Sequence, residues 1–351
     1  MGRLLDGLYA TWDGLDGPRR LGSTLRPFAI LLKLTISLVL LAVLAAALQR
    51  NDPQTFTRIR DASPQWPVLV LGWSCLFGAL VAGILRWHAV LTLLRVPTRL
   101  APVFRYSAYA YSLDFAAIGT VGGDVFKAMM LARREANRSG SILASVAIDR
   151  IIGLHSLITV AGLIALQDSW QRRAFSTLDV ALVAAAFAGN ALLASLWLVP
   201  SLSRRVATAL TPLGRAGRAA AAGITALVKL RDRPLVALVP VVSTSMLVVF
   251  LHVIGHFLVA ASLPAPSPTF TEQWRIIPVA MLSAVIPLPG GTLGALDAAM
   301  SFLYSHVTGG RVASGQGLLV TMIARVASLS MVVVAAGLYV AGGDGNSEPR
   351  A

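Results

Sequence analysis

The sequence contains few charged residues. Only 13% of its 351 residues are Asp, Glu, Lys or Arg, which is about half of the share usual in soluble domains. Hydrophobic residues make up 56%, and many of them fall in runs of about 20 residues, each long enough to cross a hydrocarbon core about 30 Å thick. These features exclude an ordinary soluble domain and predict an all-α polytopic membrane protein.

Cysteine and metal-binding or nucleotide-binding motifs are also scarce. Cys75 is the single cysteine, so no internal disulfide can form and cysteine usage does not indicate a redox compartment. His252 and His256 have helical i, i+4 spacing, but no Glu lies between them and no third ligand is apparent, so we expect them to pack or to hydrogen-bond between helices. No P-loop is present. The sequence therefore predicts neither a metal nor another cofactor.

Acidic residues are outnumbered by basic ones, 16 against 30. The basic residues are spread over short connections rather than along one face or tail, which favours anionic lipid headgroups over nucleic acid as partners. Most of them fall on the side that holds both termini, so both termini are predicted to be cytoplasmic. Arg86 and Trp87, near the end of an apolar run, fit an interfacial cation and an interfacial aromatic.

Apolar length predicts six full membrane spans within one transmembrane domain, residues 27–341. The first run is too long for a signal-peptide core and is expected to be a retained span. Residues 200–233 fit an amphipathic cytoplasmic helix near the headgroups or a solvated linker, and residues 1–26 and 342–351 are expected to be cytoplasmic segments. The predicted spans are 27–49, 67–94, 141–166, 176–199, 234–261 and 315–341.

Two further apolar segments, 103–131 and 276–305, are interrupted by the strings "GTVGGD" and "PLPGGTLG". Neither side of each break is long enough to span a membrane alone, so both segments are predicted to be re-entrant hairpins. Non-helical backbone at membrane depth is tolerated only where protein or a water-filled cavity satisfies it. The two breaks therefore predict a central cavity.

The two breaks are similar to each other. "VGGDVFKAMM" (121–130) and "PGGTLGALDAAM" (289–300) each place a glycine pair before a short helix that carries an aspartate. In the predicted topology they enter from opposite faces, which is typical of inverted repeats in secondary transporters, where helix N-termini face anionic groups. The alternative is chance recurrence in a chain with 30 glycines.

Two arginines lie deep in predicted spans. Arg150 is about nine residues into its span, where an unpaired charge is costly, so it should face the interior. Asp124 is its expected partner, and Lys127 lies at i+3 from the same aspartate. Arg325 is similarly deep, with Asp297 as its expected partner. These pairs predict either a binding site or structural salt bridges.

Four motifs together resemble those of the lysylphosphatidylglycerol synthase transmembrane family, also called flippase-like membrane proteins. They are "RWHAVL" (86–91), "GTVGGDVFKAMMLARR" (119–134), "ASVAIDRIIGL" (144–154) and "PLPGGTLGALDAAM" (287–300). The resemblance covers roughly residues 27–341 and implies a lipid-handling protein of the bacterial cytoplasmic membrane. In well-understood members this domain is fused to a soluble synthase, which we do not expect in this chain because it stops soon after its last predicted span.

The chain departs from the family pattern at two positions. The family usually has an arginine three residues after Gly-Gly-Asp, where this chain has Lys127, which keeps the charge without the bidentate fork. The second motif usually ends in Gly-x-x-Glu, where this chain has the shorter Asp297. Both departures concern the residues expected to set the headgroup preference.

The expected function is a lipid flippase or transporter, not an enzyme, that moves an anionic phospholipid or a lipid-linked headgroup. The alternatives are an intramembrane glycosyl- or aminoacyl-transferase and a non-transporting partner of an envelope-lipid synthase. The expected partners are membrane lipids, together with a second copy of the chain or a partner synthase. No catalytic or metal-binding residue is expected, and the candidate substrate-binding residues are Gly122, Gly123, Asp124, Lys127, Arg150, Pro289, Gly290, Gly291, Gly294, Asp297 and Arg325.

The predicted orientation can be tested by cysteine labelling of intact cells after Cys75 is replaced. Thr55→Cys should react with an impermeant reagent from outside, whereas Ala220→Cys should react only after the membrane is opened, because basic loops stay cytoplasmic. The reverse labelling pattern would refute the topology.

Overall fold

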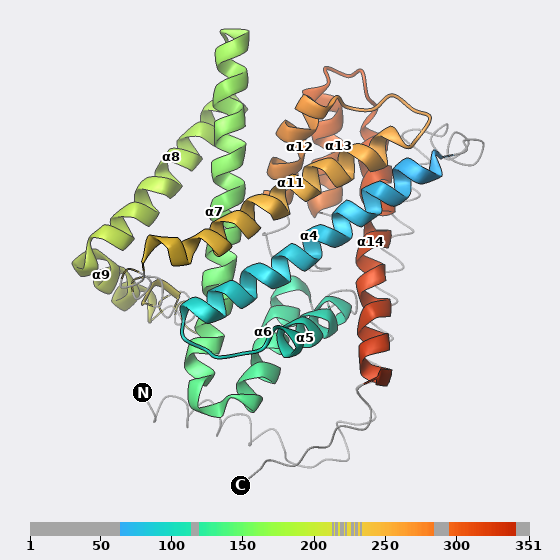
Figure 1. Ribbon diagram of the computed structural model, residues 1–351. Helices are drawn as coiled ribbons and strands as arrows, with labels where there is room; N and C mark the ends of the chain where they lie inside the picture. Colours follow the sequence, from blue (N-terminus) through green and yellow to red (C-terminus); the bar gives the residue numbers. More distant parts are fainter. Residues whose placement is uncertain are drawn as a thin grey trace. The chain divides into compact units, whose positions relative to one another are not determined.

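The computed structural model describes residues 64–113, 119–212, 234–283 and 295–341, together with single residues between 213 and 233. These residues form a succession of helices (Figure 1). The α-helices are α4 (Trp66–Leu93), α5 (Leu100–Leu113), α6 (Gly119–Arg134), α7 (Ser139–Arg172), α8 (Thr177–Leu198), α9 (Pro200–Leu210), α11 (Val239–Ala261), α12 (Phe270–Ser283), α13 (Ala295–Val307) and α14 (Ser314–Ala341). Short 3₁₀ helices are η2 (Ala136–Arg138) and η4 (Leu235–Leu238).

Five of these helical segments are long and apolar enough to cross a membrane. They confirm five of the six predicted spans and the all-α polytopic class. The predicted first span, 27–49, and the terminal segments 1–26 and 342–351 lie outside the described residues. The spanning segments are Trp66–Leu93, Ser139–Arg172, Thr177–Leu198, Leu235–Ala261 and Ser314–Leu338.

Two helical hairpins lie between the spans. Helix α5 packs against α6, and α12 packs against α13. Helices α5 and α12 have 14 residues each, or about 21 Å at 1.5 Å per residue, which is too short to cross the hydrocarbon core. Both segments predicted to be re-entrant therefore contain hairpins of short helices.

The position of the first turn differs from the sequence-based expectation. Helix α6 begins at Gly119, so Gly122 and Gly123 lie within its first turns and do not precede the helix. Glycine has a low helix propensity, and packing of α6 against α5 stabilises the helix in spite of it. The second break, including Pro289, Gly290, Gly291 and Gly294, lies outside the described residues.

Helices α4 and α11 pack side by side along their lengths (Figure 1). A Cβ atom added to Gly72 would lie 3.1 Å from Gly255 O and from the backbone nitrogen of Val259, so the two backbones approach closely here. Further along α4, Val90 clusters with Val241. Because residue numbers rise along α4 as they fall along α11, the two helices are antiparallel.

The remaining contacts follow a twofold pattern. The first hairpin contacts α7 through α6 and α14 through α5, whereas the second contacts α14 through α13 and α7 through α12. Exchanging α4, α5, α6 and α7 with α11, α12, α13 and α14 preserves each of these contacts. Since α4 and α11 correspond and are antiparallel, the halves are related as an inverted repeat, as the sequence predicts.

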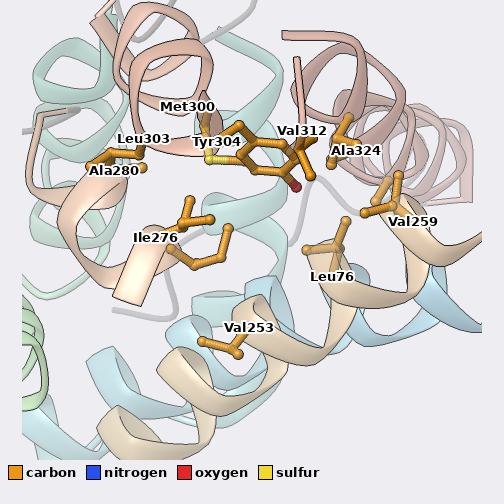
Figure 2. Packing of buried hydrophobic residues seen from close by; sticks show 14 of the residues in the cluster. Leu76, Val253, Val259, Ile276, Ala280, Met300, Leu303, Tyr304, Val312 and Ala324 are labelled. Carbon is orange, nitrogen blue, oxygen red and sulfur yellow. The ribbon is translucent and has the colours of Figure 1, made fainter. Parts of the chain in front are cut away.

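Each hairpin has its own apolar core. Around the second hairpin, Tyr304 is fully buried with Ile276 and Met300 (Figure 2), and its hydroxyl accepts a hydrogen bond from Gln273 Nε2 at 2.8 Å. Around the first hairpin, Trp87 is fully buried among residues of α4 to α7 and α14. The two cores therefore hold the hairpins against opposite ends of α4.

The buried position of Trp87 corrects its interpretation as an interfacial aromatic. Its side chain is 0% exposed, and its Nε1 donates to Ser145 Oγ at 2.9 Å. The hairpin α5–α6 covers this end of α4, which span length alone does not reveal.

Residues 200–233 are only partly described. Helix α9 begins this segment, with Ser203 buried and Arg204 and Arg205 exposed. The amphipathic cytoplasmic helix expected over the whole segment stays a prediction.

A pair of glycines on α14 tests the packing of the second hairpin. A Cβ atom at Gly317 would lie 2.4 Å from Met300 O, whereas one at Gly337 would have no neighbour within 4 Å. Gly317→Ala should therefore destabilise the protein by about 1–3 kcal/mol, while Gly337→Ala should leave stability unchanged or slightly higher. Thermal unfolding in detergent measures both, and equal melting temperatures would contradict the close α13–α14 contact.

Candidate functional site

A polar cavity of about 400 Å³ lies among α4, α5, α6, α7, α11 and α12. Arg150 lines it eleven residues after the first residue of α7, about 17 Å along the helix. Charged groups at such a depth are tolerated when they are paired or face water. The polar side chains that line the cavity are Arg86, Ser107, Tyr111, Asp124, Lys127, Asp149, Arg150, Ser156, Ser245 and His252.

Asp124 connects two cations in this cavity. Lys127 Nζ lies 2.7 Å from Asp124 Oδ1, and Arg150 donates to Asp124 Oδ2. Both pairings confirm the expectation from the sequence. Lys127 also lies over the Trp87 ring, 4.6 Å from its centroid, so the ring adds a cation–π contact.

The two cations differ in accessibility. The side chain of Arg150 is 51% exposed, against 12% for Lys127 and for Asp124. Arg150 also lines the cavity, so the more exposed of the two cations is one of its wall residues.

A second ion pair lies beside the first, about 100° around α7. Arg86 Nε and Nη2 donate to the two carboxylate oxygens of Asp149 at 2.8 and 3.2 Å. Gly153 allows this approach, since a Cβ atom there would lie 3.1 Å from the guanidinium nitrogens. Arg86 is therefore not a surface cation as expected, because α5 and α7 enclose this part of α4. The sequence did hold a hint of this pair, because Arg86 and Asp149 both belong to the four family motifs, in "RWHAVL" and "ASVAIDRIIGL".

The charges in the cavity are unequal. Arg86, Lys127 and Arg150 supply three positive charges, and Asp124 and Asp149 supply two negative ones. With the histidine neutral, the described residues of the lining carry one more positive than negative charge.

The second half contains an equivalent acid–arginine pair. Arg325 Nη2 lies 2.7 Å from both carboxylate oxygens of Asp297, which is only 2% exposed. Arg150 and Arg325 are each the twelfth residue of their helix, so they occupy the same place in the repeat. The pairing confirms the expectation, but neither Arg325 nor Asp297 lines the cavity around Asp124.

The histidines of α11 contribute differently from each other. His256 Nδ1 lies 2.8 Å from His252 O on its own helix, which is not the interhelical bond considered from the sequence. His252 lines the cavity, and its Nδ1 is buried without a hydrogen-bond partner among the described residues. No group of three or more metal-ligating side chains occurs in the described part of the chain.

Comparison with known proteins places this arrangement in a family. The family model of the lysylphosphatidylglycerol synthase transmembrane region matches residues 30–337. The chain belongs to this family. No curated protein and no solved structure matches it in the same comparisons. The match includes both hairpins and both acid–arginine pairs, and it indicates a membrane function related to lipids.

The contribution of the Asp297–Arg325 pair to the stability of this family member can be measured. Asp297→Asn should cost about 3–5 kcal/mol, because it leaves Arg325 without its carboxylate in a buried position. Asp168→Asn is a suitable control, since Asp168 is 27% exposed and its partners Arg172 and Arg275 are also partly exposed, and exposed pairs contribute about 1 kcal/mol or less.

Thermal unfolding in detergent separates these two outcomes. Adding Arg325→Met to Asp297→Asn should recover part of the loss because the uncompensated charge is removed. Wild-type stability of Asp297→Asn would show that Asp297 does not compensate Arg325.

Proposed function

We propose that the protein is a lipid flippase or transporter that moves an anionic phospholipid or a lipid-linked anionic headgroup across the membrane. The observation that carries this proposal is the cavity around Asp124, which lies among membrane-spanning helices and brings Lys127, Arg150 and Arg86 together in its described lining. A phosphate group is the membrane lipid component that such a lining attracts most strongly. The acyl chains would remain in an apolar environment.

Three cations have distinct roles in this proposal. Arg150 makes the first contact with the phosphate because it is the most exposed of them. Lys127 lies on the other side of Asp124 and adds a second charge-assisted hydrogen bond. Arg86 is held by two bonds to Asp149 and supports the positive potential without direct contact.

Asp124 keeps Lys127 and Arg150 compensated while the site is empty. When an anion arrives, each cation can exchange part of its interaction with Asp124 for the phosphate. Both aspartates in the described lining are paired with cations in the empty site, which suits compensation of those cations better than a general base and favours transport over transferase chemistry.

The inverted repeat supplies a route for alternating access. The first hairpin borders the Asp124 cavity, and the second hairpin carries Asp297 against Arg325. In the proposed cycle, movement of the hairpins between their flanking spans opens the two acid–arginine sites in turn. A lipid headgroup would pass from one arginine to the other.

The proposed setting is the bacterial cytoplasmic membrane, with both termini on the cytoplasmic side. The basic connections would then face the anionic inner leaflet. A second copy of the chain or an envelope-lipid synthase is compatible with this arrangement.

Transport can be measured with the purified protein alone in proteoliposomes. Fluorescent phosphatidylglycerol should move between leaflets faster than in protein-free vesicles. Arg150→Gln should slow this movement about tenfold or more, because a lost charge-assisted hydrogen bond is worth about 1.5–3 kcal/mol. Arg205→Gln, which changes an exposed arginine of α9, should retain the wild-type rate.

Two results would contradict the proposed function. Lipid movement equal to that of empty vesicles would favour a non-transporting partner of a synthase. Covalent change of the headgroup or of a lipid carrier, detected by mass spectrometry when donor substrates are added, would favour a transferase.

A further inference from the structure

A second cavity, of about 440 Å³, lies between α7, α8 and α11. Its lining is mainly hydrocarbon. Helices α7 and α8 are in close contact near Gly162, where a Cβ atom would lie 2.3 Å from Ala186 Cβ, and the cavity lies beyond this contact, toward the end of α8. Its apolar lining includes Ile152, Leu193, Ala194, Val241, Val242 and Met246.

The apolar cavity adjoins the charged one. Ser156 of α7 and Ser245 of α11 line both cavities. Ser156 Oγ donates to Ile152 O at 2.8 Å, and Ser245 Oγ donates to Val241 O at 2.7 Å. Because each hydroxyl is engaged by its own helix, the junction between the cavities requires no polar partner from a ligand and can admit hydrocarbon.

One polar atom in the apolar cavity lacks a hydrogen-bond acceptor among the described residues. Trp197 lines the cavity, and its Nε1 is buried without a hydrogen-bond acceptor among the described residues. Buried indole N–H groups usually have a partner. The ester oxygen of a bound acyl chain would provide one.

We propose that the apolar cavity binds one acyl chain of the same lipid whose phosphate group lies at Lys127 and Arg150. This inference rests on the proposed function and specifies its substrate as an acyl lipid held at both headgroup and chain. The charged cavity and the hydrocarbon cavity meet at Ser156 and Ser245, so their arrangement matches the amphipathic structure of such a lipid.

Photo-crosslinking tests occupancy of the cavity. The probe is phosphatidylglycerol with a diazirine on one acyl chain, reconstituted with the full-length protein, and the control probe is phosphatidylcholine with the same chain. Phosphatidylglycerol should label peptides that contain Leu193 and Met246 more strongly than phosphatidylcholine does. Arg150→Gln should reduce this labelling, because the headgroup contact holds the chain in place.

A matched pair of substitutions on α8 tests the role of the chain. Ala194 lines the cavity, whereas Ala188 is exposed on the opposite side of the helix. Ala194→Phe should lower both labelling and translocation of the phosphatidylglycerol probe about tenfold, the effect of displacing roughly two methylene groups from an apolar site. Ala188→Phe adds the same ring and should behave as wild type.

The outcomes separate this inference from the proposed function. Equal labelling by the two probes would show that bilayer lipid fills the cavity without selection and would overturn the inference. Wild-type labelling and translocation in Ala194→Phe, together with loss in Arg150→Gln, would overturn the chain site alone. Wild-type behaviour of both variants would overturn the chain site and the transport proposal together. Because Ala194 is already exposed, its substitution should not repack the core, which equal melting temperatures would verify.

Discussion

A charge placed among membrane-spanning helices must be compensated, and this constraint determines much of the structure. Arg150 is far from either end of α7, so it requires a counter-ion from a neighbouring element. Asp124 supplies it from α6, and a helix as short as α6 can bring a carboxylate to this depth only because the re-entrant hairpin enters the bundle. The same requirement is met at Arg325 by Asp297 of the second hairpin. The hairpins therefore position polar groups as well as filling space.

The inverted repeat converts this requirement into two related sites. Helices α4 and α11 form an antiparallel pair with closely approaching backbones at Gly72 and Gly255, and each hairpin is held between one long span of its own half and one of the other. The halves are not equivalent in the described structure. The charged cavity surrounds Asp124 and does not include Asp297.

Much of this arrangement could be predicted from the sequence because the signals are strong in a membrane. Apolar length located five described spans, and the cost of burying charge identified the partners of Arg150 and Arg325. The Arg86–Asp149 pair was missed because a cation near the end of an apolar run resembles an interfacial anchor when the covering hairpin is unknown. The sequence predicted that α6 starts after Gly122 and Gly123, whereas both glycines lie within it. The low helix propensity of glycine is a weak preference, and packing against α5 outweighs it here. The apolar cavity beside α8 could not be predicted from the sequence, because it is formed by the relative placement of α7, α8 and α11 and no residue pattern encodes that placement.

Among the described helices, α8 and α9 have no counterpart in the twofold pattern, and this asymmetry has an energetic consequence for the two conformations of the proposed cycle. The α4–α11 contact maps onto itself when the halves exchange roles, so it contributes equally to both conformations and cannot favour either one. Helix α8 packs on α7, which belongs to one half. Any difference in free energy between the two conformations must then arise largely from the elements outside the repeat and from residues that differ between the halves. In the proposed transport cycle, the helix pair α8–α9 would thereby help to set which face of the charged cavity is open at rest.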